Sequence, residues 1–128
     1  MITEELIVKK STFIGYLIPL TSKDEVKDII AQLRKEHKKA RHVCHAYLIN
    51  QNGAESAGFS DDGEPKNTAG RPIYDLITLK GISNVLVVVV RYFGGIKLGA
   101  GGLIRAYREC ASMTINKYLE ERKENVKN

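Results

Sequence analysis

The sequence predicts an α+β domain in which helices cover a mixed β-sheet. A continuous run of aliphatic residues from Val85 to Val90 is typical of a strand that is buried on both faces. Segments before and after this run have apolar residues at helical spacing, and shorter segments alternate as strands do. The predicted order is strands, helix, strands, helix, strand and helix, with the strand over residues 84–90 at the centre of the sheet.

The first part of the chain predicts extended structure followed by a helix. Residues 6–18 are predicted to form two short strands or one bent strand, because apolar residues alternate there and Pro19 closes the run. Ser22 and Glu25 have the spacing of a capping box, and apolar residues then recur with helical periodicity. A helix is therefore predicted over residues 23–38.

The rest of the chain predicts a hairpin and two further helices around the central strand. Residues 42–50 form the next predicted strand, and the turn cluster Gln51-Asn52-Gly53 reverses the chain so that residues 57–60 can pair with it. A short helix is predicted over residues 72–80, with a proline in its first turn. The apolar stripe of a last helix covers residues 102–120.

The composition is that of one globular domain, with 43% apolar and 27% charged residues in a chain of 128. A chain of this size buries roughly two thirds of its unfolded surface, so Cys44 and Cys110 are not needed as a disulfide. No apolar run approaches the ~20 residues of a membrane span, and Glu4 and Glu5 stand where a signal peptide has basic residues. We therefore expect a cytoplasmic protein that does not associate with membranes.

The net charge of +5 is unevenly distributed along the chain. Residues 34–42 hold five cations and one acid, residues 91–108 hold four cations and no acid, and residues 55–64 hold four acids and no base. If the fold brings the two basic segments to one side and keeps the acidic segment apart, the basic side can bind RNA phosphates. The alternative is a solvated helix end, where cations favour the helix dipole. The residues expected to bind RNA or another anion are Lys35, Lys38, Lys39, Arg41, Lys97 and Arg105.

A glycine-rich segment, Gly94 to Gly102, follows the predicted central strand. Glycines let a backbone approach a ligand closely, and the start of the next helix offers free N–H groups to an anion. The segment lacks the Gly-Lys-Ser/Thr ending of a phosphate-binding loop, and no Gly-x-Gly-x-x-Gly follows the strand directly. We favour tight turns and close packing as its role, with a phosphate- or nucleotide-binding enzyme as the alternative.

Three carboxylates, Asp61, Asp62 and Glu64, lie close together in the acidic segment. Such a group can hold a hard cation or supply an acid and a base, but it lacks the longer ligand pattern of a calcium loop. We predict instead an internal ion-pair cluster with Arg71 and Arg91, and neither a metal nor a cofactor.

The histidine and cysteine residues of the predicted strand over 42–50 do not indicate a catalytic site. His42 and His45 are three residues apart, so on a strand they point to opposite faces and cannot share one metal ion. His42 and Cys44 share a face, but the sequence supplies no orienting acid or oxyanion site for a thiol nucleophile. No residue is predicted to be catalytic.

Several segments together resemble the successive signature blocks of the IMPACT N-terminal domain family, over about residues 8 to 115. These segments are Lys10-Ser11 with Phe13-Ile14, residues 40–47, residues 60–72, and Val87 to Tyr107. The glycine-rich block has the bacterial form, with Gly101-Gly102-Leu103. The resemblance implies the fold of the second domain of a small-subunit ribosomal protein, shared with the fourth domain of elongation factor G and with a kinase superfamily. That fold can contain a left-handed crossover, against the general rule.

The resemblance also implies a connection with translation. Eukaryotic members of the family bind a ribosome-associated activator of the amino-acid-starvation kinase and regulate translation initiation. Our leading hypothesis is therefore a translation-associated binding module that contacts RNA, the ribosome or a translation-regulatory protein, with a protein-only adaptor as a further alternative.

The resemblance divides the chain into a domain and a short tail. Residues 1–120 are expected to form the IMPACT N-terminal-like domain. Residues 121–128 are expected to be a frayed tail or the start of a linker, because Val126 is their only apolar residue. The resemblance implies that many bacterial relatives continue into a ferredoxin-like second domain, which is not expected within residues 1–128.

Overall fold

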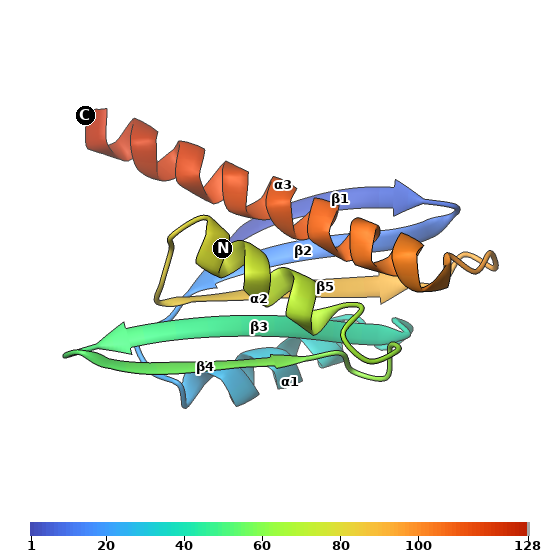
Figure 1. The fold of residues 1–128 in the computed structure, drawn as a ribbon, viewed down its shortest axis with the longest axis horizontal. Coiled ribbons are helices and arrows are strands. Elements are labelled where there is room, and N and C mark those ends of the chain that lie inside the picture. Colours follow the sequence, from blue (N-terminus) through green and yellow to red (C-terminus); the bar gives the residue numbers. More distant parts are fainter. Residues whose placement is uncertain (128) are drawn as a thin grey trace.

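The computed structural model describes the backbone of residues 1–127 and the side chains of residues 1–123. The chain forms five strands and three helices, arranged as an open sheet with helices on both faces (Figure 1). In chain order the elements are β1 (Ile2–Val8), β2 (Ser11–Pro19), α1 (Glu25–Glu36), β3 (His42–Gln51), β4 (Ala54–Ser60), α2 (Gly70–Leu79), β5 (Val85–Tyr92) and α3 (Gly99–Lys127).

The strands lie in the order β1-β2-β5-β3-β4, and every neighbouring pair is antiparallel. The α+β class is confirmed, but the expectation of a mixed sheet was wrong. The connections through α1 and α2 do join parallel strands, yet each skips one position in the sheet, so parallel strands are never neighbours. In Figure 1 the connection from β4 through α2 to β5 is left-handed, the crossover that the family resemblance allows.

The β5 strand is the centre of the molecule, as its aliphatic run predicted. It pairs with β2 on one side and with β3 on the other. All residues from Val85 to Val90 are fully buried. The odd-numbered ones belong to the core under α2 and α3, and the even-numbered ones belong to the core under α1. A strand with a core on each face requires apolar residues at every position, which explains the unbroken run.

The local signals for turns and helix starts are confirmed with small shifts. Asn52 and Gly53 have φ of 53° and 79° and join β3 to β4, which begins at Ala54, three residues before the prediction. The extended segment at the start is a hairpin, and β1 begins at Ile2. The carboxylate of Glu25 accepts the backbone N–H of Ser22 at 2.8 Å, which is one of the two bonds of a capping box, but the N-cap residue of α1 is Asp24.

The last helix, α3, is longer than predicted at both ends. It begins at Gly99 and continues through Lys127, so residues 121–127 belong to this helix. Tyr118 and Leu119 still pack on the core, and the following Glu, Arg and Lys residues are good helix formers. Among residues 1–127, none of the three helices combines the length and apolar character that a membrane span requires.

Candidate functional site

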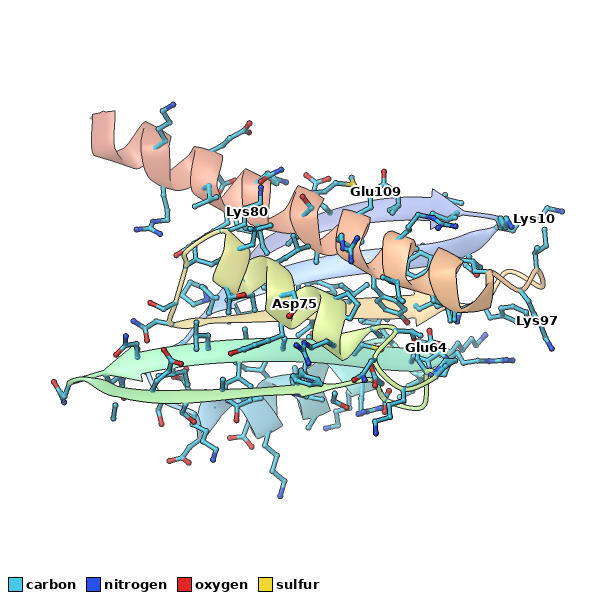
Figure 2. The ribbon with its side chains drawn as sticks, in the orientation of Figure 1. Lys10, Glu64, Asp75, Lys80, Lys97 and Glu109 are labelled. Atoms are coloured by element: carbon cyan, nitrogen blue, oxygen red, sulfur yellow. The ribbon has the colours of Figure 1, made fainter. Side chains whose placement is uncertain are left out.

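A pocket of about 310 Å³ lies at the end of the sheet where β3 begins and β5 ends. Its walls come from the start of β3, the loop between β4 and α2, the end of β5 and the N-terminus of α3. We call it the Glu64 pocket, and its charged or titratable residues are Arg41, His42, Glu64, Arg91 and Lys97. Figure 2 shows Glu64 and Lys97 at this end, together with Lys10 of the turn between β1 and β2.

Glu64 is a buried carboxylate whose oxygens are fully engaged by the protein. Its side chain is 3% exposed, and its oxygens lie 2.8 and 3.0 Å from Nη1 of Arg91. The hydroxyl of Tyr107 donates to the same carboxylate, and Nε2 of His42 lies 3.4 Å from it. Burial raises the pKa of Tyr107, so this hydroxyl stays protonated and acts as a donor. Such partners offset the cost of burying a carboxylate.

Arg91 forms the inner wall of the Glu64 pocket. Its side chain is 6% exposed, and its guanidinium carbon lies 5.5 Å from the ring centre of Phe93. The Nη1 atom is bonded to Glu64, whereas Nε has no hydrogen-bond partner among the described residues. Arg41 lies over the ring of Phe93 as well, at 4.8 Å. The aromatic ring therefore helps to hold both guanidinium groups at the pocket.

The two aspartates before Glu64 serve other internal purposes. The carboxylate of Asp61 accepts three backbone N–H groups around the start of α2, including that of Gly70 at 2.9 Å. Asp62 binds both terminal nitrogens of Arg34, at 2.7 and 3.1 Å, and accepts the backbone N–H of Val43 at 2.6 Å. Burial opposes ionisation of Asp62, but the hydrogen bonds from Arg34 and Val43 outweigh it and lower the pKa.

The predicted ion-pair cluster is thus divided in the structure. Glu64 and Arg91 meet in a buried pair, but Asp61 binds backbone groups and Asp62 pairs with Arg34. Arg71 pairs with Asp75, one turn further along the exposed face of α2. The charge sums of the sequence segments did not indicate that Asp62 pairs with Arg34. The sequence also gave no signal that Tyr107 or His42 contacts Glu64.

Cys44 lies beside this network in the core. Its thiol donates to the carbonyl oxygen of Asp61 at 3.1 Å and lies 3.5 Å from the hydroxyl of Tyr107. Burial raises the pKa of the Cys44 thiol, so the nucleophilic thiolate is disfavoured.

The predicted basic residues do not form one continuous patch. Arg41 and Lys97 line the Glu64 pocket, and Lys38 and Lys39 are exposed in the connection that leads into it. Arg105 lines a second groove with Lys9 and Glu109, which shares Leu98 with the Glu64 pocket, and Lys35 is exposed on the last turn of α1. Sequence reasoning did not include Lys9 and Lys10, although Gly94 packs against the carbonyl of Lys10 at the same end.

The expectation that the acidic segment stays apart from the basic segments was wrong. Because β4 is antiparallel to β3, the loop after β4 returns to the point where β3 begins. Asp62 therefore contacts Arg34, and its carbonyl oxygen lies 2.7 Å from Nδ1 of His42. Asp61, Asp62 and Glu64 lie at the same end as the cations, but their carboxylates are occupied by internal partners.

Close packing and backbone conformation explain why glycine occupies two positions of the glycine-rich segment. A Cβ atom on Gly94 would lie 2.0 Å from the carbonyl oxygen of Lys10, so no side chain fits there. Gly99, at the first position of α3, has φ of 75°, which favours glycine. Gly101 and Gly102, expected before or at the helix start, already belong to its first turn.

Residues 9–115 match the family model described as the Impact N-terminal domain. The chain belongs to this family. It is 42% identical to the IMPACT family member YvyE of Bacillus subtilis, over 88% of this chain and 51% of that protein. It is 38% identical to the IMPACT family member YigZ of Escherichia coli, over 91% of this chain and 57% of that protein. This IMPACT domain therefore spans about half the length of these relatives.

Two solved structures are similar to this IMPACT domain. A crystal structure of a hypothetical protein has a TM-score of 0.83 and 37% identity, and the match covers 90% of this chain and 56% of that one. The structure of the two-domain translational regulator Yih1 has a TM-score of 0.52 and 29% identity, covering 88% of this chain and 44% of that one.

Proposed function

We propose that this IMPACT domain is a translation-associated module that binds structured RNA through one end of its sheet. This basic end comprises the exposed side chains of Lys9, Lys10, Lys38, Lys39, Arg41 and Lys97. The proposal draws its link with translation from the relative Yih1, which is described as a translational regulator. It draws the choice of RNA from the balance of charge at this end.

The observation that carries the proposal is the internal engagement of the nearby acids. Asp62 is paired with Arg34, Glu64 is buried against Arg91, and Asp61 binds backbone N–H groups. The carboxylates of residues 61–64 are therefore already engaged by internal partners and leave the cations of the basic end largely without counterions from this loop. Contacts to RNA phosphates require a high density of positive charge, and they do not require a motif that recognises bases. Exposed cations on several loops therefore suit an RNA backbone.

A salt titration of RNA binding tests the proposal. Filter binding of a structured ribosomal RNA fragment should give an affinity that falls steeply with salt, because each phosphate contact releases condensed counterions. In Lys38→Gln/Lys39→Gln, the magnitude of the slope of log K against log salt should fall by roughly 2, with no change in melting temperature.

The matched control removes two charges from the opposite end of α1. Lys23→Gln/Lys27→Gln changes the net charge equally, and both lysines are exposed at the start of that helix. The slope in this variant should stay close to that of the unmodified protein. Absence of RNA affinity at low salt would refute the proposal and favour a protein partner. An equal loss in both variants would show that net charge, not the basic end, controls binding.

A further inference from the structure

We infer that the Glu64 pocket binds a phosphate monoester, the group found at an RNA end or on a free nucleotide. The inference rests on the proposed function for the RNA source only, and the pocket shares Arg41 and Lys97 with the exposed basic end. Its support comes from the charge of the pocket, the helix terminus at its wall, the donors of Arg91, and its size and apolar surface.

The charge of the pocket fits an anion that carries more than one negative charge. Three cations, Arg41, Arg91 and Lys97, line the pocket with a single carboxylate, that of Glu64. The formal sum is +2 when His42 is counted as neutral. A phosphate monoester carries about −1.5 to −2 at pH 7, whereas an internal phosphodiester of RNA carries one charge. The charge balance therefore favours the monoester.

The wall formed by α3 adds backbone donors. Gly99 and Ala100, at the start of this 29-residue helix, line the pocket. The first N–H groups of a helix have no intrahelical acceptor, and they carry the positive end of the helix dipole. At the start of α2, the carboxylate of Asp61 accepts such a group from Gly70, but the first turn of α3 contains no acidic residue. An anion in the pocket would meet these donors.

Arg91 supplies an independent observation inside the pocket. Its side chain is more than nine-tenths buried and lines the pocket, yet its Nε donor has no acceptor among the described residues. Glu64 is bonded through Nη1 and holds the guanidinium in place. Buried donors are normally paired, and a planar guanidinium suits phosphate oxygens. Arg91 therefore adds a buried positive charge to the wall of the pocket, although its Nε atom is itself enclosed, and this charge favours an anionic ligand.

The size and the apolar surface indicate that the ligand is larger than a bare ion. The volume of about 310 Å³ is near the lower end of the range for small-molecule sites, roughly 300–1,000 Å³. Pro65, Phe93 and Leu98 contribute apolar surface beside the cations. A sugar or base attached to the phosphate would cover that surface, which a free phosphate ion would leave in contact with water.

Calorimetry and RNA binding together test the inference. The calorimetric probes are uridine 5′-monophosphate, its methyl phosphodiester and uridine. The RNA probes are one short single strand with a phosphate at the 5′ end, at the 3′ end, or at neither. We expect the monophosphate to bind at least about tenfold more tightly than the diester or uridine, because only it matches the charge of the pocket.

Two variants test the pocket. Ala100→Asp leaves every cation of the basic end in place, whereas Lys97→Gln removes a cation that the pocket and the basic end share. Ala100→Asp places a carboxylate at the start of α3, where it favours the helix dipole but repels an anion, so the preference for the monoester should disappear while melting temperature is kept. Lys97→Gln should weaken the preference by removing one exposed cation. Asn116→Asp is the matched control, because it adds the same charge on an exposed position of α3 that does not line this pocket.

The outcomes distinguish this inference from the proposed function. A preference for phosphorylated RNA ends that Ala100→Asp removes supports the inference with an RNA end as the source. Binding of uridine 5′-monophosphate without such a preference supports it with a free nucleotide as the source, even if RNA does not bind. Equal binding of all three RNA probes, with no binding of the monophosphate, overturns the inference and leaves salt-dependent RNA binding intact.

Discussion

Replacing Glu64 by glutamine should destabilise the domain strongly although the two side chains have nearly the same shape. The carboxylate accepts two close contacts from Arg91 and one from Tyr107, and both it and Arg91 are almost fully buried. Glu64→Gln leaves the guanidinium as a buried charge without a counterion. Removing one partner of a buried ion pair costs about 3 to 5 kcal/mol. That is a large part of the roughly 5 to 15 kcal/mol by which domains are stable.

Urea unfolding followed by circular dichroism measures this cost against a matched control. Asp75→Asn makes the same acid-to-amide change in the pair with Arg71, whose side chains are 55% and 56% exposed. This control should lose less than about 1 kcal/mol, because solvent screens an exposed pair. Glu64→Gln/Arg91→Met should recover part of the loss by removing the unpaired charge. Equal losses in Glu64→Gln and Asp75→Asn would refute the assignment of Glu64 as the counterion of Arg91.

Four further predictions concern the central strand, the Cys44 thiol, the Asp62 carboxylate and metal binding. Val88→Asp places an unpaired charge in the core under α1 and should abolish the cooperative thermal transition; an unchanged melting temperature would reject the placement of β5. Cys44 should react with a thiol reagent at pH 8 only after denaturant is added, because burial raises its pKa; rapid reaction of the folded protein would contradict this. The lowered pKa of Asp62 means that its ionised form stabilises the fold above the unfolded pKa of about 3.9 and that this stability is lost as pH falls through the folded value. Asp62→Asn should therefore show a shallower loss of stability in acid than the unmodified protein, and parallel curves would count against the Arg34 contact. Titration with magnesium or manganese should release no stoichiometric heat, because the three acidic side chains have internal partners; a signal that Asp62→Ala removes would reopen the metal alternative.

The parts of the fold that local physics determines could be predicted from the sequence. The run from Val85 to Val90 is typical of a doubly buried strand, and Asn52-Gly53 provides the positive φ angles of a hairpin turn. The sequence pattern did not predict which strands are neighbours in the sheet. A connection that skips one strand and a connection that joins neighbours have the same local sequence pattern, so the mixed sheet was a reasonable but wrong expectation.

The candidate site was predictable in its residue types but not in its pairings. The excess of cations in residues 34–42 and of acids in residues 55–64 was visible, and Arg91 was among the expected partners of Glu64. Which charges meet depends on which ends of strands come together, and that follows from topology. The contact of Arg34 with Asp62 and the donation from Tyr107 to Glu64 arise in this way and have no local signature.

The late position of β5 in the chain shapes the order of folding during synthesis. Residues before Val85 contain two hairpins, β1 with β2 and β3 with β4, and β5 is the only strand that bridges them among residues 1–127. Until β5 is made, the edges of β2 and β3 that will receive it are open to other strands. The nascent chain therefore holds two separate halves, which the insertion of β5 joins, and the core under α2 and α3 closes only when α3 has followed.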